Sequence, residues 1–153
     1  MAKSKLRTTL DSAEAQCLQK GTRLTGKRKA VLAGLLNSKK AMTAYELTDY
    51  CKRELGESFP VMSVYRILEF LESENLVHKL KLASRYVACI HINCDHQHAV
   101  PQFLICNECY RVEETDLGNS TLGALRRKVE GAGFELVSRQ IEVDCICSDC
   151  AVS

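Results

Sequence analysis

Two pairs of cysteines, each with two residues between its members, stand in the last third of the chain: Cys106 with Cys109, and Cys147 with Cys150. A Cys-x-x-Cys turn presents both sulfurs on one side of the backbone, and two such turns supply the four thiolates of a tetrahedral zinc site. Four thiolates leave no coordination position for a substrate. We therefore predict a structural zinc site and a function that lies elsewhere in the chain.

These cysteines could instead be buried apolar thiols or a redox pair, but neither alternative requires a second pair at matching spacing. Cys145 could replace Cys147 as a ligand. The matched spacing favours Cys147, and we expect Cys145 to be a non-ligand or a redox-labile thiol. For Cys17, Cys51 and Cys94 we expect a packing role.

A second group of candidate ligands is less regular. All four histidines lie in one short segment, close to thiols and carboxylates: His78, Cys89, His91, Cys94, His96, His98, Glu113 and Glu114. Clustered imidazole, thiol and carboxylate groups favour a metal site, although the pattern by itself does not select the ligands. Because histidine and cysteine must lose protons to bind metal, the occupancy of such a site can vary, which suits a sensor.

Composition restricts the class of protein. The 153 residues, 46% of them hydrophobic, can form one domain or two small ones. An odd count of nine cysteines and a lysine-bearing start without an apolar segment argue against a secreted, disulfide-bonded protein. We expect reduced thiols in the cytoplasm and no membrane association, because no segment approaches the roughly 18 apolar residues of a membrane helix.

Charge is distributed unevenly along the chain. Residues 1–80 carry 14 Lys and Arg against 9 Asp and Glu, whereas residues 81–153 carry 7 against 10. A basic front half suits a polyanion such as DNA, with ordinary solvated charge as the alternative.

Residues 1–90 predict a winged helix-turn-helix domain. A leading helix is expected at 11–20, followed by three more helices and two β-favouring runs at 76–80 and 85–90. The helix boundaries are indicated by capping and turn residues, namely Gly21, Thr25, Thr43, Glu46, Gly56 and Pro60. In the helix after Pro60, an apolar face (Val64, Ile67, Leu68, Leu71) lies opposite Met62, Tyr65, Arg66 and Glu69, which makes it the candidate recognition helix.

The polar, histidine-rich stretch 91–101 predicts a hinge, and residues 91–153 predict a second domain. Strands are expected at 102–105, 111–115 and 134–143, with a helix at 119–130. The fold class is therefore α+β, in which the winged helix-turn-helix domain precedes a small α/β domain.

Seven segments together carry a family resemblance: Arg23-Leu-Thr25 with Arg28, Thr43-Ala-Tyr-Glu-Leu47, Val64-Tyr-Arg66, Leu76-Val-His-Lys79, Tyr86-Val-Ala-Cys89, Phe103-Leu-Ile-Cys-Asn-Glu-Cys109 and Cys147-Ser-Asp-Cys150. With these motifs, nearly the whole chain resembles the ferric uptake regulator family of bacterial metal sensors, most closely its zinc uptake regulator branch. The resemblance implies a homodimer, held by the second domain, that binds palindromic operator DNA when zinc-loaded and represses zinc-uptake genes.

The same resemblance implies two Zn2+ ions per subunit. The structural ion would bind the four paired cysteines. The regulatory ion would bind His78, Cys89, His98 and Glu114, with His96 or His91 as alternatives to His98. Because His78 and Cys89 belong to the predicted hairpin and Glu114 to the second domain, one regulatory ion would join the two domains.

By the same resemblance, Tyr45 and Arg66 would contact bases, with Tyr65, Arg28 and Ser63 also on the DNA-facing side. Arginine can bind the O6 and N7 atoms of guanine, and a tyrosine ring can pack on a thymine methyl group. Tyr65 could instead be a half-buried packing residue, and Arg28 plain solvated charge. Ser63 stands where the family usually has threonine, which affects the details of DNA docking.

Three rival functions stay open. A sensor of iron, manganese or peroxide would keep the fold, although the Cys89 thiolate favours zinc. A zinc enzyme is disfavoured, because no histidine is followed two residues later by glutamate and Pro101 does not directly precede a thiol pair. We therefore expect no enzymatic activity and no small-molecule substrate. The third rival is a structural zinc module that binds protein partners.

Overall fold

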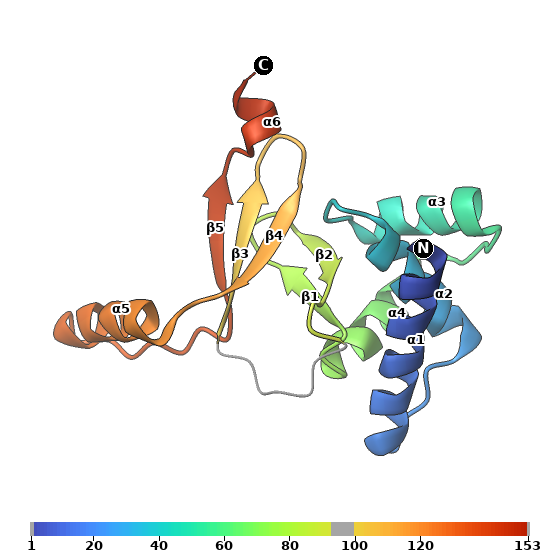
Figure 1. The fold of residues 1–153 in the computed structure, drawn as a ribbon, viewed down its shortest axis with the longest axis horizontal. Coiled ribbons are helices and arrows are strands. Elements are labelled where there is room, and N and C mark those ends of the chain that lie inside the picture. Colours follow the sequence, from blue (N-terminus) through green and yellow to red (C-terminus); the bar gives the residue numbers. More distant parts are fainter. Residues whose placement is uncertain (1, 93–99, 153) are drawn as a thin grey trace. The chain divides into compact units, whose positions relative to one another are not determined.

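A computed structural model describes residues 2–92 and 100–152 (Figure 1). The chain divides into two compact units, Met1–Cys94 and Asp95–Ser153. In the described part of the chain, no helix combines the length and the apolar character needed to cross a membrane.

The first unit is built from four helices followed by a β-hairpin. Its elements are α1 (Ala2–Gln19), α2 (Gly26–Asn37), α3 (Ala44–Leu55), α4 (Val61–Ser73), β1 (Val77–Leu80) and β2 (Arg85–Ala88). The second unit is a three-stranded sheet with two helices. Its elements are β3 (Pro101–Cys106), β4 (Val112–Asp116), α5 (Asn119–Gly131), β5 (Ile141–Cys145) and α6 (Ser148–Ala151).

The predicted capping residues set the helix boundaries of the first unit. The Thr25 hydroxyl accepts a hydrogen bond from the Arg28 N–H at 3.4 Å, and the Thr43 hydroxyl accepts one from the Glu46 N–H at 3.1 Å. Such side-chain acceptors satisfy backbone donors that have no partner inside the helix. Gly56 ends α3 with a φ of 66°, the left-handed conformation that glycine adopts without strain.

Helix α4 has the two faces that the sequence predicts. Val64, Leu68 and Leu71 are fully buried, whereas Met62 is 62% exposed and Arg66 is exposed. The buried face joins side chains of α1, α2, α3 and β1 in one hydrophobic core. Burial on this scale, about 1.5–3 kcal/mol for each large apolar side chain, is what holds the polar face of α4 outward.

The hairpin completes a winged helix-turn-helix unit, so the predicted fold class is confirmed for this part of the chain. β1 and β2 pair antiparallel, with His78 opposite Val87. The backbone of Met42, between α2 and α3, also pairs with Tyr86 through hydrogen bonds of 3.1 and 2.8 Å. This extra bridge attaches β2 to the helical part of the unit.

The leading helix is longer than predicted, since α1 begins at Ala2 rather than near residue 11. Its first two turns are mostly exposed and carry no apolar stripe, which is why periodicity did not reveal them. The Thr8 and Thr9 hydroxyls donate to the carbonyls of Ser4 and Lys5, at 2.9 and 3.0 Å.

The sheet of the second unit has the strand order β4-β3-β5, in which β3 is antiparallel to β4 and parallel to β5. Because β3 and β5 run in the same direction, their carboxyl ends meet at one end of the sheet. Helix α6 lies at that end and α5 at the other (Figure 1). The residues that follow β3 and those that follow β5 are therefore brought together at the end of the sheet where α6 lies.

The predicted strand at 134–143 is wrong in its extent, because β5 begins only at Ile141. Its partner β3 begins at Pro101, and Gln102 pairs with Ile141, so the described residues offer no strand edge to the segment before Ile141. That segment exposes Phe134 and Val137, which are 72% and 78% accessible. Its β-favouring residues are typical of a strand, yet a strand also needs a neighbour.

Candidate functional site

The parallel pairing of β3 and β5 brings the two Cys-x-x-Cys turns together. Cys106 and Cys145 end the two strands and lie opposite each other in register. The Asn107 N–H donates to the Cys145 carbonyl at 2.9 Å, which fixes the start of the first turn against the end of β5. The second turn follows directly, with Cys147 as the residue before α6 and Cys150 inside that helix.

The four sulfurs form a compact cluster. The Sγ atoms of Cys106, Cys109, Cys147 and Cys150 all lie within 4.8 Å of one another. The Cys109 and Cys147 sulfurs are 3.7 Å apart. A tetrahedral zinc ion with Zn–S bonds of about 2.3 Å separates its sulfurs by roughly 3.8 Å, whereas a disulfide requires about 2.05 Å. The spacing therefore fits a four-thiolate metal site.

The backbone around the cluster favours ionised sulfur. Hydrogen bonds from the backbone N–H groups of Cys109 and Cys147 lower the pKa of Cys106 to about 6. Hydrogen bonding to the Cys147 side chain, together with burial, raises the pKa of Cys150. The four thiols thus share their protons unequally, and a cation at the centre would favour the thiolate form of all of them.

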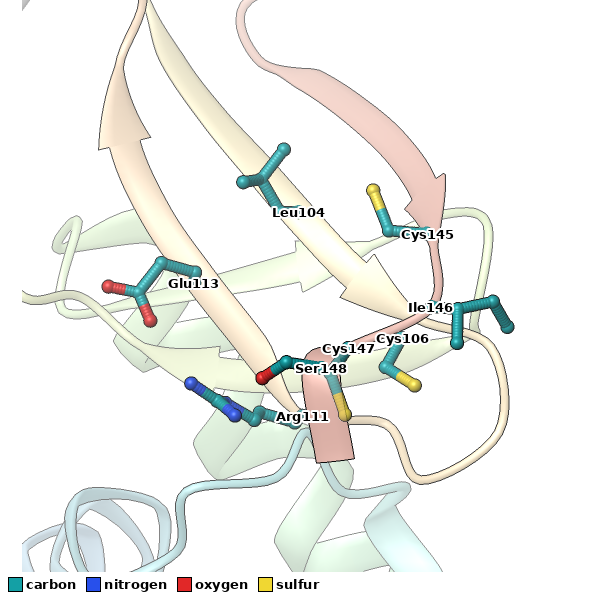
Figure 2. A pocket seen from close by; sticks show the side chains of 8 residues that line it. All are labelled: Leu104, Cys106, Arg111, Glu113, Cys145, Ile146, Cys147 and Ser148. Atoms are coloured by element: carbon teal, nitrogen blue, oxygen red, sulfur yellow. The ribbon is translucent and has the colours of Figure 1, made fainter. Parts of the chain in front are cut away.

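Cys145 does not belong to the four-sulfur cluster. Its Sγ donates to the Val143 carbonyl at 3.5 Å. In Figure 2 the Cys145 sulfur points away from the sulfurs of Cys106 and Cys147. These three cysteines line one surface pocket together with Leu104, Arg111, Glu113, Ile146 and Ser148. The geometry agrees with the preference for Cys147 over Cys145 as a metal ligand.

Sequence reasoning did not anticipate a polar link between the two turns. Arg111 Nη1 lies 3.5 Å from Asp149 Oδ2, which joins the second residue after the first turn to a residue inside the second turn. The Cys106 N–H also donates to the Arg111 carbonyl at 2.9 Å. Both side chains of the ion pair are well exposed, so its contribution to stability is at most about 1 kcal/mol.

Two members of the second predicted ligand set are neighbours in the first unit. His78 lies on β1, and Cys89 directly follows β2. A ring nitrogen of His78 and the Cys89 Sγ lie within 4.8 Å. The Cys89 N–H donates to the Leu76 carbonyl at 2.9 Å, and the His91 N–H donates to the Cys89 sulfur at 3.4 Å. The hairpin therefore presents an imidazole and a thiol side by side as candidate ligands.

The other predicted ligands belong to other segments of the chain. Glu114 lies on β4 in the second unit and is 8% exposed, whereas its neighbour Glu113 is exposed. A largely buried carboxylate is uncommon without a partner group. His96 and His98, like Cys94, lie outside the described residues. Cys17 and Cys51 are fully buried in the core of the first unit, where burial raises the pKa of each thiol.

The residues predicted to face DNA share one region of the first unit. Tyr45, in the first turn of α3, is 66% exposed, and its ring meets the Tyr65 ring edge to face with centroids 6.3 Å apart. Tyr65 is half-buried and packs partly against the core, as the packing alternative predicts, and its contact with DNA stays a prediction. Arg66 is exposed on α4, and Ser63 is half-buried in its first turn.

Arg28 has a role that the sequence did not suggest. Its guanidinium lies over the Phe70 ring, and Nη1 donates to the Arg23 carbonyl at 2.6 Å. Sequence reasoning overlooked Phe70. The available signal was an aromatic residue beside the apolar stripe of α4.

Arg85 of β2 was overlooked too. It forms an ion pair with Glu46 and donates to the Ala41 carbonyl at 3.3 Å, which links the hairpin to α3.

Comparisons with known proteins agree with this architecture. The Zinc uptake regulation protein of Escherichia coli (strain K12) is 31% identical over 150 residues, which cover 98% of this chain and 85% of that protein. A solved zinc uptake regulator complexed with zinc and DNA has 28% identity and a TM-score of 0.79, covering 96% of this chain and 95% of its own. The crystal structure of holo XcZur has 34% identity and a TM-score of 0.74, covering 95% and 99%.

The sequence model of the ferric uptake regulator family matches residues 19–144, which include α2 to α5, the hairpin and the first Cys-x-x-Cys turn. With this match and the relatives above, the chain belongs to the ferric uptake regulator family.

Proposed function

We propose that this protein is a zinc-responsive transcriptional repressor, which binds palindromic operator DNA as a homodimer when zinc-loaded and represses zinc-uptake genes. The likeness to a zinc uptake regulator complexed with zinc and DNA supports this proposal over nearly the full chain. The protein acts by binding, without a catalytic step, and its reduced thiols suit the cytoplasm.

The observation that carries the choice of zinc is the pair formed by His78 and Cys89. An imidazole nitrogen and a thiol sulfur within 4.8 Å of each other offer borderline and soft ligands. Such ligands suit zinc, whereas carboxylate, carbonyl and water oxygens suit manganese and other hard ions. A thiol at this position therefore favours a zinc sensor over an iron, manganese or peroxide sensor of the same fold.

Each subunit is proposed to bind two zinc ions. The structural ion takes the four-sulfur cluster, whose spacing fits tetrahedral ligation. The regulatory ion takes His78 and Cys89 from the first unit and Glu114 from the second, with His98 as the fourth ligand. Zinc, when bound there, supplies a link between ligands of the two units. Protonation of His78 or Cys89 opposes binding, so the site responds to both zinc and pH.

Repression then follows from a shift in population. Ligands held by both units limit their relative movement, which raises the fraction of dimers whose two α4 helices match successive major grooves, about 34 Å apart. A hundredfold preference of zinc for this arrangement would bias the equilibrium by about 2.7 kcal/mol. His78, Cys89 and Glu114 act only by binding; the exposed face of α4 reads the DNA.

The surface of the second unit supports the homodimer. Helix α5 has no buried residue, although it carries Leu122, Leu125 and Val129. Phe134 and Val137 just after it are 72% and 78% exposed. Exposed apolar side chains gathered in one segment are typical of an interface. A second copy of the unit would cover them.

The test starts from protein that retains only its most tightly bound ion. Zinc is titrated into it while binding to a palindromic AT-rich duplex is followed at fixed salt, because affinity for DNA depends steeply on salt. We expect tight binding only after a second zinc ion per subunit has bound. Specific binding that ignores zinc and follows iron or manganese would assign the protein to another branch of the family. The absence of specific binding with any metal would contradict a DNA-binding role.

Adjacent glutamates provide a matched pair of variants. Glu114→Ala should abolish the zinc-dependent gain in DNA affinity, because it removes a proposed ligand, and His78→Ala and Cys89→Ala should do the same. Glu113→Ala changes the same charge on the exposed side of β4 and should respond to zinc like the wild type. All four variants should remain dimeric. A full zinc response in Glu114→Ala would exclude that residue from the site.

A further inference from the structure

Helix α1 and the residue directly after it contact the chain on both sides of the β1–β2 hairpin. The Gln16 side-chain amide donates to the carbonyl of Ile92, which follows β2. Lys20 Nζ donates to the carbonyl of Glu74, which precedes β1, at 3.2 Å, and lies 3.9 Å from the Glu74 carboxylate. Gln16 lies in the last turn of α1, and Lys20 directly follows that helix, four residues further along the chain.

Both contacts lie against a packed part of the unit. Ile92 is 3% exposed and Glu74 is 8% exposed. On α1, Ala13 and Cys17 are fully buried in the same hydrophobic core as Ile92. The Thr22 N–H and hydroxyl both bind the Cys17 carbonyl, at 2.8 and 3.0 Å, which holds the end of the helix. The end of α1 is thus packed into the core of the unit, and it can restrain the chain segments at Ile92 and Glu74.

The segment between the two contacts carries the ligand pair. His78 lies four residues after Glu74, and Cys89 lies three residues before Ile92. The Cys89 N–H bonds the Leu76 carbonyl, so the start and the end of the hairpin are joined close to both ligands. We propose that α1 sets the distance between the His78 imidazole and the Cys89 thiol, with Gln16 and Lys20 as positioning residues for the regulatory metal. This inference rests on the proposed function.

The physical reason is preorganisation. A metal ion binds most tightly when its ligands already hold the required geometry, because less conformational entropy is then lost on binding. The residues that bind and orient metal ligands influence affinity strongly for this reason. Releasing the carbonyl of Ile92 loosens the turn that carries Cys89. Releasing the carbonyl of Glu74 loosens the approach to His78.

The decisive variant is Gln16→Glu, which keeps the size of the side chain and removes its N–H donor. A carboxylate cannot donate to the Ile92 carbonyl and is repelled by it. The matched control is Gln19→Glu, which introduces the same charge on the exposed surface of the same helix. The wild type and both variants are prepared so that each retains only its most tightly bound ion, and each is then titrated with Co2+. The charge-transfer absorption of cobalt bound to the Cys89 thiolate reports binding at the second site.

We expect Gln16→Glu to bind the second ion about fivefold more weakly than the wild type, the change that one ordinary hydrogen bond supports. Its thiolate-to-cobalt band should shift, because the ligand geometry changes. Gln19→Glu should match the wild type in affinity and spectrum. The content of the first ion should be the same in all three proteins, and Gln16→Glu, which loses one partly buried hydrogen bond, should remain folded at the temperature of the titration.

Several results would overturn the inference. An unchanged affinity and spectrum in Gln16→Glu, while the wild type binds a second ion, would exclude the positioning role, as would an equal loss in Gln19→Glu. If Gln16→Glu is partly unfolded under the conditions of the titration, Lys20→Met replaces it as the test, since Lys20 is exposed. An unchanged affinity in Lys20→Met would also exclude the role. A wild type that binds no second ion would contradict the proposed function itself, a result distinguishable from all of these.

Discussion

The Arg28 guanidinium carbon lies 3.6 Å from the centroid of the Phe70 ring, so that the first turn of α2 is attached to the last turn of α4. The same guanidinium donates to the Arg23 carbonyl at 2.6 Å. A cation over an aromatic face gains about 0.5–1 kcal/mol at an accessible site and more when it is shielded from water. Arg28 therefore contributes to the packing of the helices, independently of any contact with DNA.

Replacing Arg28 by alanine should lower the free energy of unfolding by about 1 kcal/mol, because both the ring contact and the hydrogen bond are lost. Chemical denaturation monitored by circular dichroism measures this change. Lys27→Ala, which removes a charge from the adjacent exposed position, should leave stability within about 0.5 kcal/mol of the wild type. If Arg28→Ala keeps its stability but shows a shallower salt dependence of DNA binding, Arg28 is a phosphate contact instead.

Two cysteines separated by one residue should behave differently when replaced. Cys147→Ser should lose the tightly bound zinc ion and destabilise the second unit, because Cys147 belongs to the four-sulfur cluster. Cys145→Ser should keep the ion, since the Cys145 thiol donates to the Val143 carbonyl instead. Metal analysis after dialysis against a chelator measures the difference. Retention of zinc by Cys147→Ser together with its loss from Cys145→Ser would reverse the ligand assignment.

The fold was predictable wherever local signals and burial agree. The helix boundaries lie where they were expected, with Thr25 and Thr43 at helix starts and Gly56 at a helix end. The apolar face of α4 is the buried one. The apolar residues after Gly133 misled the prediction, because a strand requires a partner and β3 offers none before Ile141. Local patterns carry no information about where the neighbouring strand begins.

The four-sulfur cluster was predictable because each Cys-x-x-Cys turn is a short local pattern that can be recognised in the sequence. The parallel pairing of β3 and β5 then brings the two turns together. Other contacts depend on packing between helices and could not be read from one segment. The Phe70 ring beneath Arg28 joins α4 to α2, and the bond from Gln16 to the Ile92 carbonyl joins residues 76 positions apart. No sequence period connects such residues, so only the folded structure reveals them.

Phe134 should be central to dimer formation. Gly133, with a φ of 88°, and the bond from the Phe134 N–H to the Val129 carbonyl at 3.0 Å hold the ring at the end of α5, where it is 72% exposed. Burying one phenylalanine contributes about 1.5–3 kcal/mol, and a symmetric dimer buries two. Phe134→Asp should therefore raise the dimer dissociation constant at least about a hundredfold.

Sedimentation equilibrium over a range of protein concentrations measures that constant. Leu18→Asp is the control, because Leu18 is also well exposed, at 64%, but lies on α1 in the first unit. It should dimerise like the wild type. An unaffected dimer in Phe134→Asp would place the interface elsewhere on the chain.

Arg66 should read a base rather than a phosphate. It is exposed on the polar face of α4, close in sequence to Tyr65, whose ring meets that of Tyr45 edge to face. A bidentate contact between arginine and guanine discriminates against the wrong base by about 1–3 kcal/mol. Arg66→Ala should therefore weaken zinc-loaded binding to the operator by about this amount, with little change in binding to unrelated DNA and in the salt slope.

The control is Arg53→Ala, which removes an exposed arginine that pairs with Asp49 at 3.1 Å on α3. This variant should bind the operator like the wild type. An equal loss of affinity for every sequence in Arg66→Ala, with a salt slope reduced by about one, would make Arg66 a phosphate contact and leave base recognition to other residues.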